Sequence, residues 1–283
     1  MEIRHIHTQY RSISIATPVT LLPALEQSVF SCLLEPGGKK LPRHYQIYPE
    51  NNRFSLYRQK RKTHRNRSVN KIIYALEWQI VEDLIKAHKK VLQFHAAALE
   101  YNQHGYLFVG LPGSGKTSLS IFLQRHGWQL LSDEFGLVDP ASRQMIAMPR
   151  NIIIKPHLST LLEVPQNGRG IRIRSDNPKQ AESFFVPADT FGIVSLQNRT
   201  VLQKLILLKA DPEREYTLEK TSQVRAFEFL FDHLFTHRLE NAQEFDTLVN
   251  VLRNCSTAIL TLRNPLTLPE QAATQLVTEL RNL

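Results

Sequence analysis

The sequence predicts an α/β protein whose core is built around one strand–loop–helix unit, preceded by an N-terminal α+β extension. Three adjacent stretches predict this class. An apolar, β-prone run ends at Val109. Residues 110–117 (GLPGSGKT) then satisfy the P-loop pattern G-x-x-x-x-G-K-[ST] in full. Residues 118–126 place apolar side chains at helical spacing, and Gly127 follows where a helix C-terminus favours glycine.

Composition limits the class of protein. The chain has 283 residues, of which 42% are hydrophobic and 22% charged, which suits a soluble protein with a sizeable core. We find no apolar run long enough for a transmembrane helix and no signal-peptide core, so no membrane association is expected. Cys32 and Cys255 lie far apart in the sequence, which favours reduced thiols and a cytoplasmic location.

The N-terminal extension reads as mixed strand and loop up to about residue 56. We expect strands at 13–17 and 54–57 and a short helix at 23–30. Residues 58–67 then hold six Lys or Arg in ten positions. A solvated hairpin or loop, a patch that attracts an acidic protein or peptide, and nucleic-acid contact are three interpretations. Nucleic acid is the least favoured, because no aromatic interleaving accompanies the charges.

The remaining elements follow from periodicity and turn signals. Residues 70–89 predict a helix, and residues 91–101 predict a strand that forms a β-hairpin with the strand before the loop. Residues 164–182 are polar and predict a flexible loop. Further strands are expected at 128–131, 135–138, 145–148, 151–154, 191–194, 201–208 and 258–262, and further helices at 227–234, 242–251 and 270–280.

The glycine-rich loop predicts a nucleoside triphosphate site. Its backbone N–H groups and the positive end of the following helix would surround the phosphates. Lys116 would supply a point charge for the β- and γ-phosphates, and the Thr117 hydroxyl would ligate Mg²⁺. The residues expected to bind the nucleotide are Gly110, Leu111, Pro112, Gly113, Ser114, Gly115, Lys116, Thr117 and Ser118.

Two acids and one histidine complete the expected site. Asp133 and Glu134 end an apolar strand 17 residues after Lys116, which leaves room for one helix and a returning strand. Carboxylates there would hold Mg²⁺ directly or through water. The alternative is an acidic turn on the surface. His95 lies 21 residues before Lys116 on the paired strand. A histidine among alanines is often a core residue, but reach toward the carboxylates favours a role at the site.

These residues resemble a known family. Residues 94–97 (FHAA), the loop, and residues 127–134 (GWQLLSDE), in that order, resemble HPr kinase/phosphorylase. They are more similar to its shorter relatives, HPr-kinase-like proteins of bacterial biosynthetic gene clusters, some of which phosphorylate a serine of a lasso-peptide precursor. Glu77-Trp78, Pro149-Arg150 and Lys155 also resemble those relatives. The resemblance covers about residues 70–156.

The resemblance implies a PEP-carboxykinase-like P-loop fold, with residues 70–283 as the kinase domain and 1–69 as an extension or small subdomain. It implies transfer of the γ-phosphoryl group of ATP, with Mg²⁺, to a serine hydroxyl of a peptide or small protein. Asp133 matches the catalytic aspartate, and His95 matches the histidine that supports the carboxylates. Glu134 stands where the family has a second aspartate, so the choice of base and metal ligand between Asp133 and Glu134 stays open.

The remaining cations have more than one interpretation, and two other functions compete with that of a serine kinase. Arg150 and Lys155 would neutralise charge on the γ-phosphate, or would be exposed strand ends. Arg169, Arg172 and Arg174 would close over the site from a loop. The family's later segment that is associated with dephosphorylation has no convincing match here beyond a fragment at Arg169-Gly170-Ile171, so we expect kinase activity without dependable phosphorylase activity. A kinase of a small-molecule hydroxyl and a nucleotide-gated binding protein with little turnover are the competing functions, and a homo-oligomer is compatible with the sequence.

Overall fold

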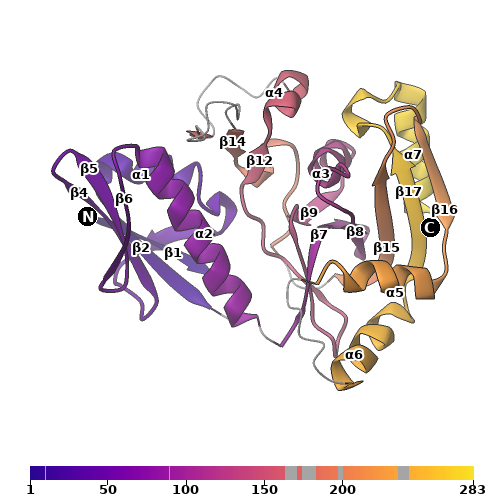
Figure 1. Cartoon of the computed structure of the whole chain (residues 1–283), viewed down its shortest axis with the longest axis horizontal. Helices are drawn as coiled ribbons and strands as arrows, with labels where there is room; N and C mark the ends of the chain where they lie inside the picture. The colour runs from indigo at the N-terminus through magenta and orange to yellow at the C-terminus, as the bar shows by residue number, and fades with distance from the viewer. Residues whose placement is uncertain (10, 89, 163–170, 174–182, 197–199, 235–241) are drawn as a thin grey trace. The chain divides into compact units, whose positions relative to one another are not determined.

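The computed structural model of the chain contains two compact units (Figure 1). The first comprises Met1–Lys89 and Arg150–Thr190, and the second comprises Lys90–Pro149 and Phe191–Leu283. The structure describes residues 1–9, 11–88, 90–162, 171–173, 183–196, 200–234 and 242–283. In the described residues, no helix is both long and apolar enough to cross a bilayer.

The first unit contains a sheet with the strand order β3-β1-β2-β4-β5-β6. Neighbouring strands are antiparallel, except that β2 and β4 are parallel. The strands are β1 (Glu2–His7), β2 (Ser12–Thr17), β3 (Leu34–Gly37), β4 (His44–Glu50), β5 (Arg53–Arg58) and β6 (Arg61–Asn66). The short helices are η1 (Val19–Leu21), α1 (Leu22–Glu26) and η2 (Ser31–Leu33).

Helix α2 (Val69–Ala87) is the longest helix of the first unit and packs on β5 and β6. Its apolar residues recur every three or four positions, as in Ile73, Leu76 and Ile80, and all three are buried. Asp83 on the same helix accepts a hydrogen bond from the hydroxyl of Tyr45 at 2.6 Å. This packing ties α2 to the N-terminal strands.

Residues 150–190 return to the first unit. They form a small sheet in the order β12-β14-β13, together with helix α4 (Pro156–Leu162) and the short helix η3 (Ala188–Thr190). The strands are β12 (Ile152–Ile154), β13 (Ile171–Ile173) and β14 (Ser183–Val186). The Asn151 side chain joins this segment to the N-terminal part: its Oδ1 accepts from the N–H of Ser31 at 3.0 Å, and its Nδ2 donates to the carbonyl of Gln27 at 2.8 Å.

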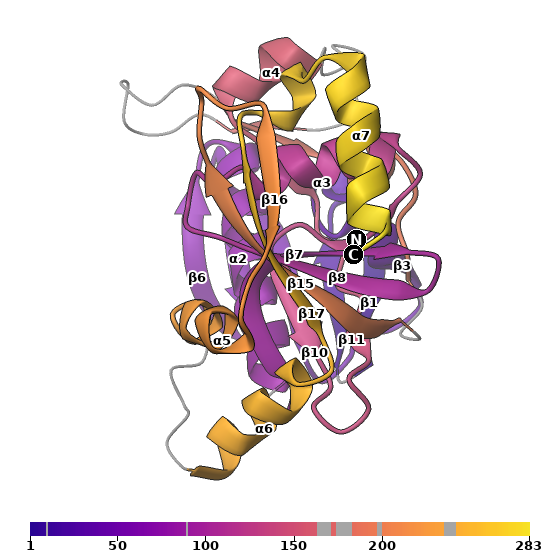
Figure 2. The ribbon, with the colours of Figure 1, turned by 90° about the vertical axis from the view of Figure 1, so that its right-hand side faces the viewer.

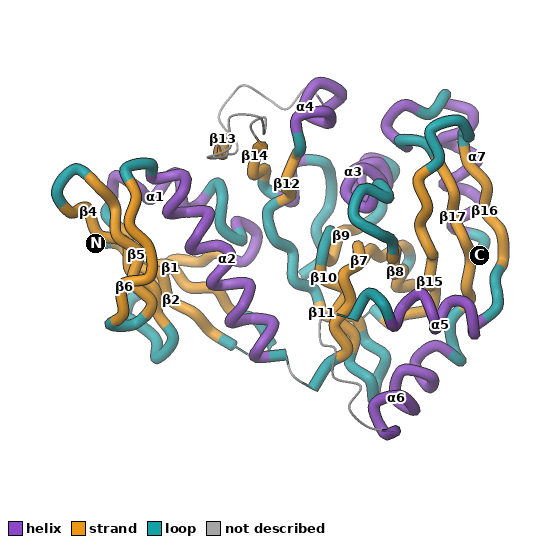
Figure 3. Tube along the Cα trace, in the orientation of Figure 1, coloured by secondary structure: helices purple, strands orange, loops and turns teal. Residues whose placement is uncertain are grey.

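The second unit is built on an eight-stranded sheet in the order β11-β10-β7-β8-β15-β17-β16, with β9 also paired to β7 (Figure 3). The three neighbours β8, β15 and β17 run parallel. The strands are β7 (Leu92–Tyr101), β8 (His104–Val109), β9 (Gln129–Ser132), β10 (Phe135–Val138), β11 (Met145–Ile146), β15 (Val201–Ala210), β16 (Tyr216–Lys220) and β17 (Ser256–Leu262). The helices are α3 (Lys116–Arg125), α5 (Gln223–Phe231), α6 (Ala242–Leu252), η4 (Pro265–Thr267) and α7 (Glu270–Arg281).

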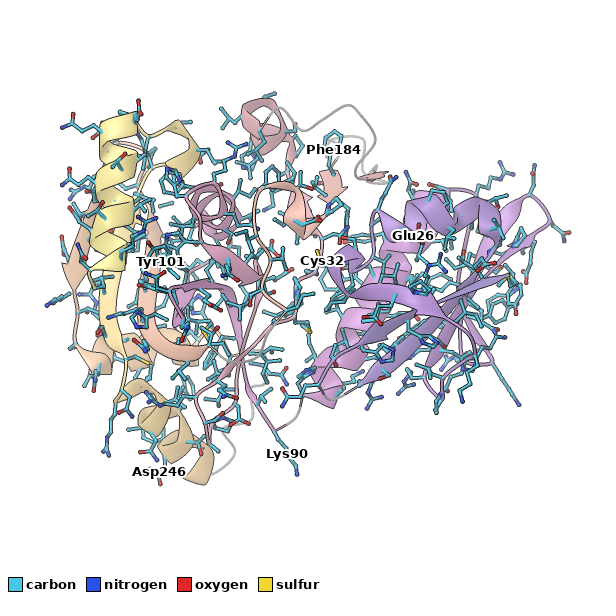
Figure 4. The ribbon with its side chains drawn as sticks, turned by 180° about the vertical axis from the view of Figure 1, so that it is seen from behind. Glu26, Cys32, Lys90, Tyr101, Phe184 and Asp246 are labelled. Atoms are coloured by element: carbon cyan, nitrogen blue, oxygen red, sulfur yellow. The ribbon has the colours of Figure 1, made fainter. Side chains whose placement is uncertain are left out.

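Both faces of this sheet are covered, which explains why β8 is buried continuously from Gly105 to Val109. Leu107 and Val109 belong to a core cluster that includes residues of α5 and α6. Both helices are labelled in Figure 2. The alternate residue Tyr106 packs edge-on against Trp128 at 4.4 Å between ring centroids, and its hydroxyl donates to the carbonyl of Leu280 in α7. Tyr101, which is labelled in Figure 4, also packs on Trp128. The P-loop strand therefore lies in the middle of the hydrophobic core.

Much of the predicted element order is confirmed, as is the α/β class. One predicted strand is wrong: residues 191–194 form only an isolated bridge between Val194 and Leu130. The expected helix at 227–234 begins earlier, because the Ser222 hydroxyl accepts from the N–H of Arg225 and caps α5. Strands β1, β3, β4, β14 and β16 and helix α4 had no individual prediction, and β13 lies within residues 164–182, which were predicted as a flexible loop.

The compact units divide the chain differently from the predicted ranges 1–69 and 70–283. Helix α2 and residues 150–190 belong to the first unit, because their contacts are with the N-terminal strands and loops. Both cysteines are free thiols, as expected, and they lie in different units: Cys32 is half-buried in the first (Figure 4), and Cys255 is buried in the second.

Candidate functional site

The glycine-rich loop has the strand–loop–helix geometry that its sequence predicts. Strand β8 ends at Val109, and α3 begins at Lys116. Gly113 and Gly115 have φ values of +88° and +95°, in the left-handed region that strains any residue with a Cβ. Gly115 is the N-cap of α3. These two glycines let the chain turn sharply into the helix, where the first N–H groups lack intrahelical partners and are available to an anion.

Gly110 is required for a different reason, which is space. A Cβ at this position would lie 2.7 Å from the carbonyl oxygen of Leu208 on β15 and closer still to the Ser114 hydroxyl. Because one of these neighbours is backbone of the adjacent strand, a side chain would displace either the loop or β15. The loop is therefore held close to the carboxyl end of the neighbouring parallel strand, where open α/β sheets bind ligands.

Lys116 folds back over this loop. Its side chain is buried, and Nζ donates to the carbonyl oxygens of Gly110 at 2.5 Å and Leu111 at 3.3 Å. Thr117 is half-buried and Ser118 is buried in the first turn of α3. The ammonium group thus lies over the glycine turn, within the segment that would surround the phosphates of a nucleotide.

The two predicted acids, Asp133 and Glu134, lie between β9 and β10, two successive strands that both pair with β7. Strand β7 pairs with β9 through Ala98 and Ser132 and then with β10 through His95 and Phe135. Residues 133 and 134 connect the two ladders, and the N–H of Ala96 donates to the Glu134 carbonyl at 3.2 Å. Ala96 pairs on its other side with Val109, the last residue of β8. The register therefore brings the acids, His95 and the start of the loop to the same end of adjacent strands.

The ring of His95 lies in the electrostatic field of the other site residues. Partial burial lowers the pKa of His95, the positive charge of Lys116 lowers it further, and the carboxylate of Glu134 opposes these effects. A lowered pKa keeps the imidazole neutral near pH 7. His95 is half-buried on β7, the strand that pairs with the P-loop strand, as predicted.

His233 is a neighbour of the site that the sequence did not indicate. Its carbonyl accepts the N–H of His95 at 2.8 Å, and its charge also lowers the pKa of His95. The His233 ring is buried, stacks on Phe229 at 4.7 Å between centroids, and hydrogen-bonds through Nδ1 to the Phe229 carbonyl. A histidine four residues after an aromatic at a helix end is a weak signal. Only the tertiary fold places it at His95.

The oxygen donors at the site fit Mg²⁺. Thr117 offers a hydroxyl, while buried Asp133 and half-buried Glu134 offer carboxylates, and all are hard oxygen ligands. Among the residues that the structure describes, no group of three or more His, Cys, Asp and Glu forms a metal cage. Magnesium at a phosphoryl-transfer site typically takes one or two carboxylates, phosphate oxygens and water, so this donor set is of the kind that such a site uses.

The other predicted cations belong to the first unit. Arg150 is buried, its Nε lies 2.9 Å from Glu77 Oε1, and its guanidinium lies 5.7 Å from the centroid of the Trp78 ring. It is therefore not an exposed strand end, and the structure assigns it a carboxylate partner. Lys155 is exposed, just before α4. Arg169 and Arg174 lie outside the described residues, and Arg172 lies within β13.

Comparison with known proteins gives similarity to solved structures alone, and it is distant. No family model and no curated protein matches the chain. Among solved structures, the Hpr(Ser) kinase/phosphatase from Coxiella burnetii is similar over 67% of this chain and 94% of that chain, with 15% identity and a TM-score of 0.30. A likeness at this TM-score carries no functional conclusion.

Proposed function

We propose that this protein is an ATP-dependent phosphotransferase that moves the γ-phosphoryl group of ATP to a serine hydroxyl of a peptide or small protein. One observation carries the proposal. The strand register brings the glycine loop with Lys116, the half-buried His95 and the acidic pair Asp133–Glu134 to the same end of adjacent strands. A loop, a cation and a carboxylate are the parts that phosphoryl transfer requires.

Each part has a distinct task in the proposed reaction. The loop amides and Lys116 hold the phosphates in line with the acceptor. Mg²⁺, when bound to Thr117 and the acidic pair, supplies charge neutralisation at the β- and γ-phosphates. The serine oxygen forms a bond to the γ-phosphorus while the bond to the β–γ bridging oxygen breaks, and ADP leaves. The serine proton passes to a carboxylate of the acidic pair, for which Asp133 is the first candidate.

His95 would act on the acidic pair rather than on the phosphate. Two neighbouring carboxylates repel one another, so a nearby group that donates a hydrogen bond or carries partial charge influences which of them accepts the proton. The lowered pKa of His95 means that it performs this task as a neutral imidazole near pH 7. A nucleotide-gated binding protein needs the loop and one metal ligand. The acidic pair beside a half-buried histidine therefore favours transfer over gating.

The test is phosphate transfer measured by mass spectrometry. The protein is incubated with Mg·ATP and serine-containing peptides encoded beside its gene, with free serine and small hydroxyl compounds in parallel. We expect a peptide to gain one phosphate. Asp133→Asn should abolish the gain, while the matched control Asp139→Asn should retain it, because the Asp139 side chain only caps the turn at Ala141 and Ser142.

Two outcomes would contradict the proposal. Tight ATP binding without any phosphorylated acceptor would favour the nucleotide-gated protein. Phosphorylation of a small hydroxyl compound, with every peptide left unmodified, would assign the same site to a small-molecule kinase. Full transfer activity in Asp133→Asn would show that Asp133 is not the base, and Glu134→Gln would then be the next variant to measure.

A further inference from the structure

The excess of positive over negative charge in this protein lies in one segment of the sequence. The whole chain has a formal net charge of +9. Between Lys39 and Arg67 there are ten Lys or Arg residues and a single acid, Glu50, so this segment alone accounts for the excess. The rest of the chain is balanced. The segment contains β4, β5 and β6, which are consecutive strands at one side of the sheet in the first unit.

The most basic of these strands is at the edge of its sheet. In the described part of the chain, β6 (RKTHRN) pairs only with β5, and its backbone makes no other backbone hydrogen bond. Arg61, Lys62, His64 and Arg65 are exposed. An edge strand presents a row of N–H and C=O groups that can pair with another extended chain. Strand β6 thus combines an open edge with a high density of cations.

Several of the cations are already engaged, and others are not. Lys62 forms an ion pair with Glu50 at 2.7 Å, and Arg58 forms one with Asp83 of α2. Among the residues that the structure describes, we find no ion pair for Arg61 or Arg65. Lys62 of β6 and Arg58 of β5 are therefore engaged within the first unit, whereas Arg61 and Arg65 of β6 are exposed.

A pocket lies at the hairpin end of the same strand. It has a volume of about 380 Å³ and is lined by Pro42, His44, Arg58, Gln59, Lys60 and Arg61. The side-chain Nε2 of Gln59 donates to the carbonyl of Pro42 at 3.3 Å, and its backbone N–H donates to the carbonyl of His44 at 2.8 Å. These bonds hold the turn against the adjacent β4. The pocket is basic and large enough for an acidic side chain.

We propose that β6 is a docking strand for an acidic peptide segment in extended conformation. The segment would extend the sheet by pairing with the free edge of β6, with acidic side chains against Arg61 and Arg65 and one carboxylate in the pocket. The proposal rests on the proposed function in one respect: the docked segment belongs to the same peptide as the phosphorylated serine. Recognition would then depend on charge and backbone pairing, away from the serine itself.

Charge complementarity selects this occupant over two others. A second copy of the chain would bring the same basic edge, and like charges on facing strands are destabilising. Single-stranded nucleic acid would need aromatic stacking partners, but β6 contains no aromatic residue other than His64. Cations on an edge strand also protect against aggregation. Protection against aggregation does not by itself explain why all of the excess positive charge of the chain lies in this one segment.

The direct test is peptide binding without nucleotide, so that its outcome is independent of catalysis. A fluorescein-labelled peptide of alternating Glu and Val is titrated with the full chain, and anisotropy is measured. We expect saturable binding that Arg61→Glu/Arg65→Glu weakens by about five- to tenfold, the scale of losing two exposed charge pairs. The control Lys209→Glu/Arg225→Glu alters two exposed cations of the second unit and should leave the affinity unchanged.

A second peptide and a structural readout distinguish strand pairing from charge attraction. Replacing each Val by Pro keeps the charge but removes backbone donors, and it should abolish binding. Hydrogen exchange should show protection at β6 amides when the first peptide is added. Equal binding of both peptides, unaltered exchange at β6, or tighter binding of an oligouridylate would overturn the proposal.

If the peptide docks but no serine is phosphorylated, the docking strand stands and the proposed kinase function fails. The converse result would retain the kinase and reject the docking strand.

Discussion

The two units of this protein place their buried charged groups in different settings. In the first, buried carboxylates have fixed side-chain partners. Asp83 accepts a hydrogen bond from Tyr45 and forms ion pairs with Arg43 and Arg58, and Glu77 forms an ion pair with Arg150. In the second, Lys116 hydrogen-bonds to carbonyls of a glycine turn, beside a strand that bears His95. Side-chain pairs fix a fold, whereas a cation on a loop with open amides suits a ligand that arrives and leaves.

This difference separates structural from functional charges. Removing a charge in the first unit should reduce the free energy of unfolding and leave the nucleotide chemistry intact in molecules that remain folded. Removing one from the loop of the second unit should abolish nucleotide use with little effect on stability.

The largest effect is expected at the buried pair of the first unit. Glu77→Gln leaves the Arg150 guanidinium buried without its carboxylate, and loss of one partner of a buried pair costs about 3–5 kcal/mol. Urea denaturation should show this loss. The double variant Glu77→Leu/Arg150→Met replaces the pair with apolar groups and should recover most of the stability.

The double variant also decides the predicted role of Arg150. If it folds and retains phosphotransfer, Arg150 is a structural residue. If it folds and loses transfer while still binding ATP, Arg150 contacts the transferred phosphate as the sequence predicted, and the separation of the two units by function is broken. A single variant that unfolds as easily as the wild type would show that the pair contributes nothing.

The next effect is expected at the loop lysine. Lys116→Ala removes the charge over the glycine turn, and transfer should fall at least about a hundredfold, or roughly 2.8 kcal/mol of transition-state stabilisation. The midpoint of unfolding should change little. Lys220→Ala, at an exposed position on β16 of the same unit, is the matched control and should retain full activity. Undiminished transfer in Lys116→Ala would contradict the whole site.

Local patterns in the sequence predicted the second unit better than the first. The strand, loop and helix around Lys116 are consecutive, and the hairpin from β7 to β8 is a local pairing, so period and turn signals were sufficient. Asp133 and Glu134 were also predictable, because they directly follow the apolar strand that comes after α3 in the sequence. The elements that define the first unit come from distant parts of the chain, such as Asn151 bonded to Ser31.

The missed site features have the same cause. His233 reaches His95 through a backbone hydrogen bond that spans more than a hundred residues of sequence. The Glu77 partner of Arg150 was not predicted, because a sequence shows a charge but not its partner. The ion pair with Glu77 depends on where residues 150–190 rejoin the N-terminal strands. No periodic signal encodes a contact of that kind.

A smaller effect should distinguish two glycines of the loop. Gly110→Ala places a Cβ 2.7 Å from the Leu208 carbonyl, so the loop or β15 must shift, at a cost of about 1–3 kcal/mol and with weaker ATP binding. Gly113→Ala meets no atom within 4 Å but must hold φ near +88°, at a cost of about 1 kcal/mol. Calorimetric titration with Mg·ATP measures the nucleotide affinity of each variant. Equal affinities in the two variants would show that the close approach to β15 does not position the loop.

The smallest effect is a pH dependence that each unit should show through one histidine. Burial lowers the pKa of both His88 and His95, so the unfolded chain takes up a proton at higher pH than the folded chain does. Stability should therefore fall as pH decreases from 7 through the ordinary histidine pKa of about 6.5. Phosphates bound beside Lys116 would add negative charge near His95 and raise its pKa. His88 belongs to the other unit, and its Nδ1 hydrogen-bonds to the Leu84 carbonyl of α2. NMR titration of the imidazole protons, with and without Mg·ATP, should show a nucleotide-dependent shift for His95 alone. The same shift at His88, or none at His95, would mean that the nucleotide does not bind where the loop and β7 meet.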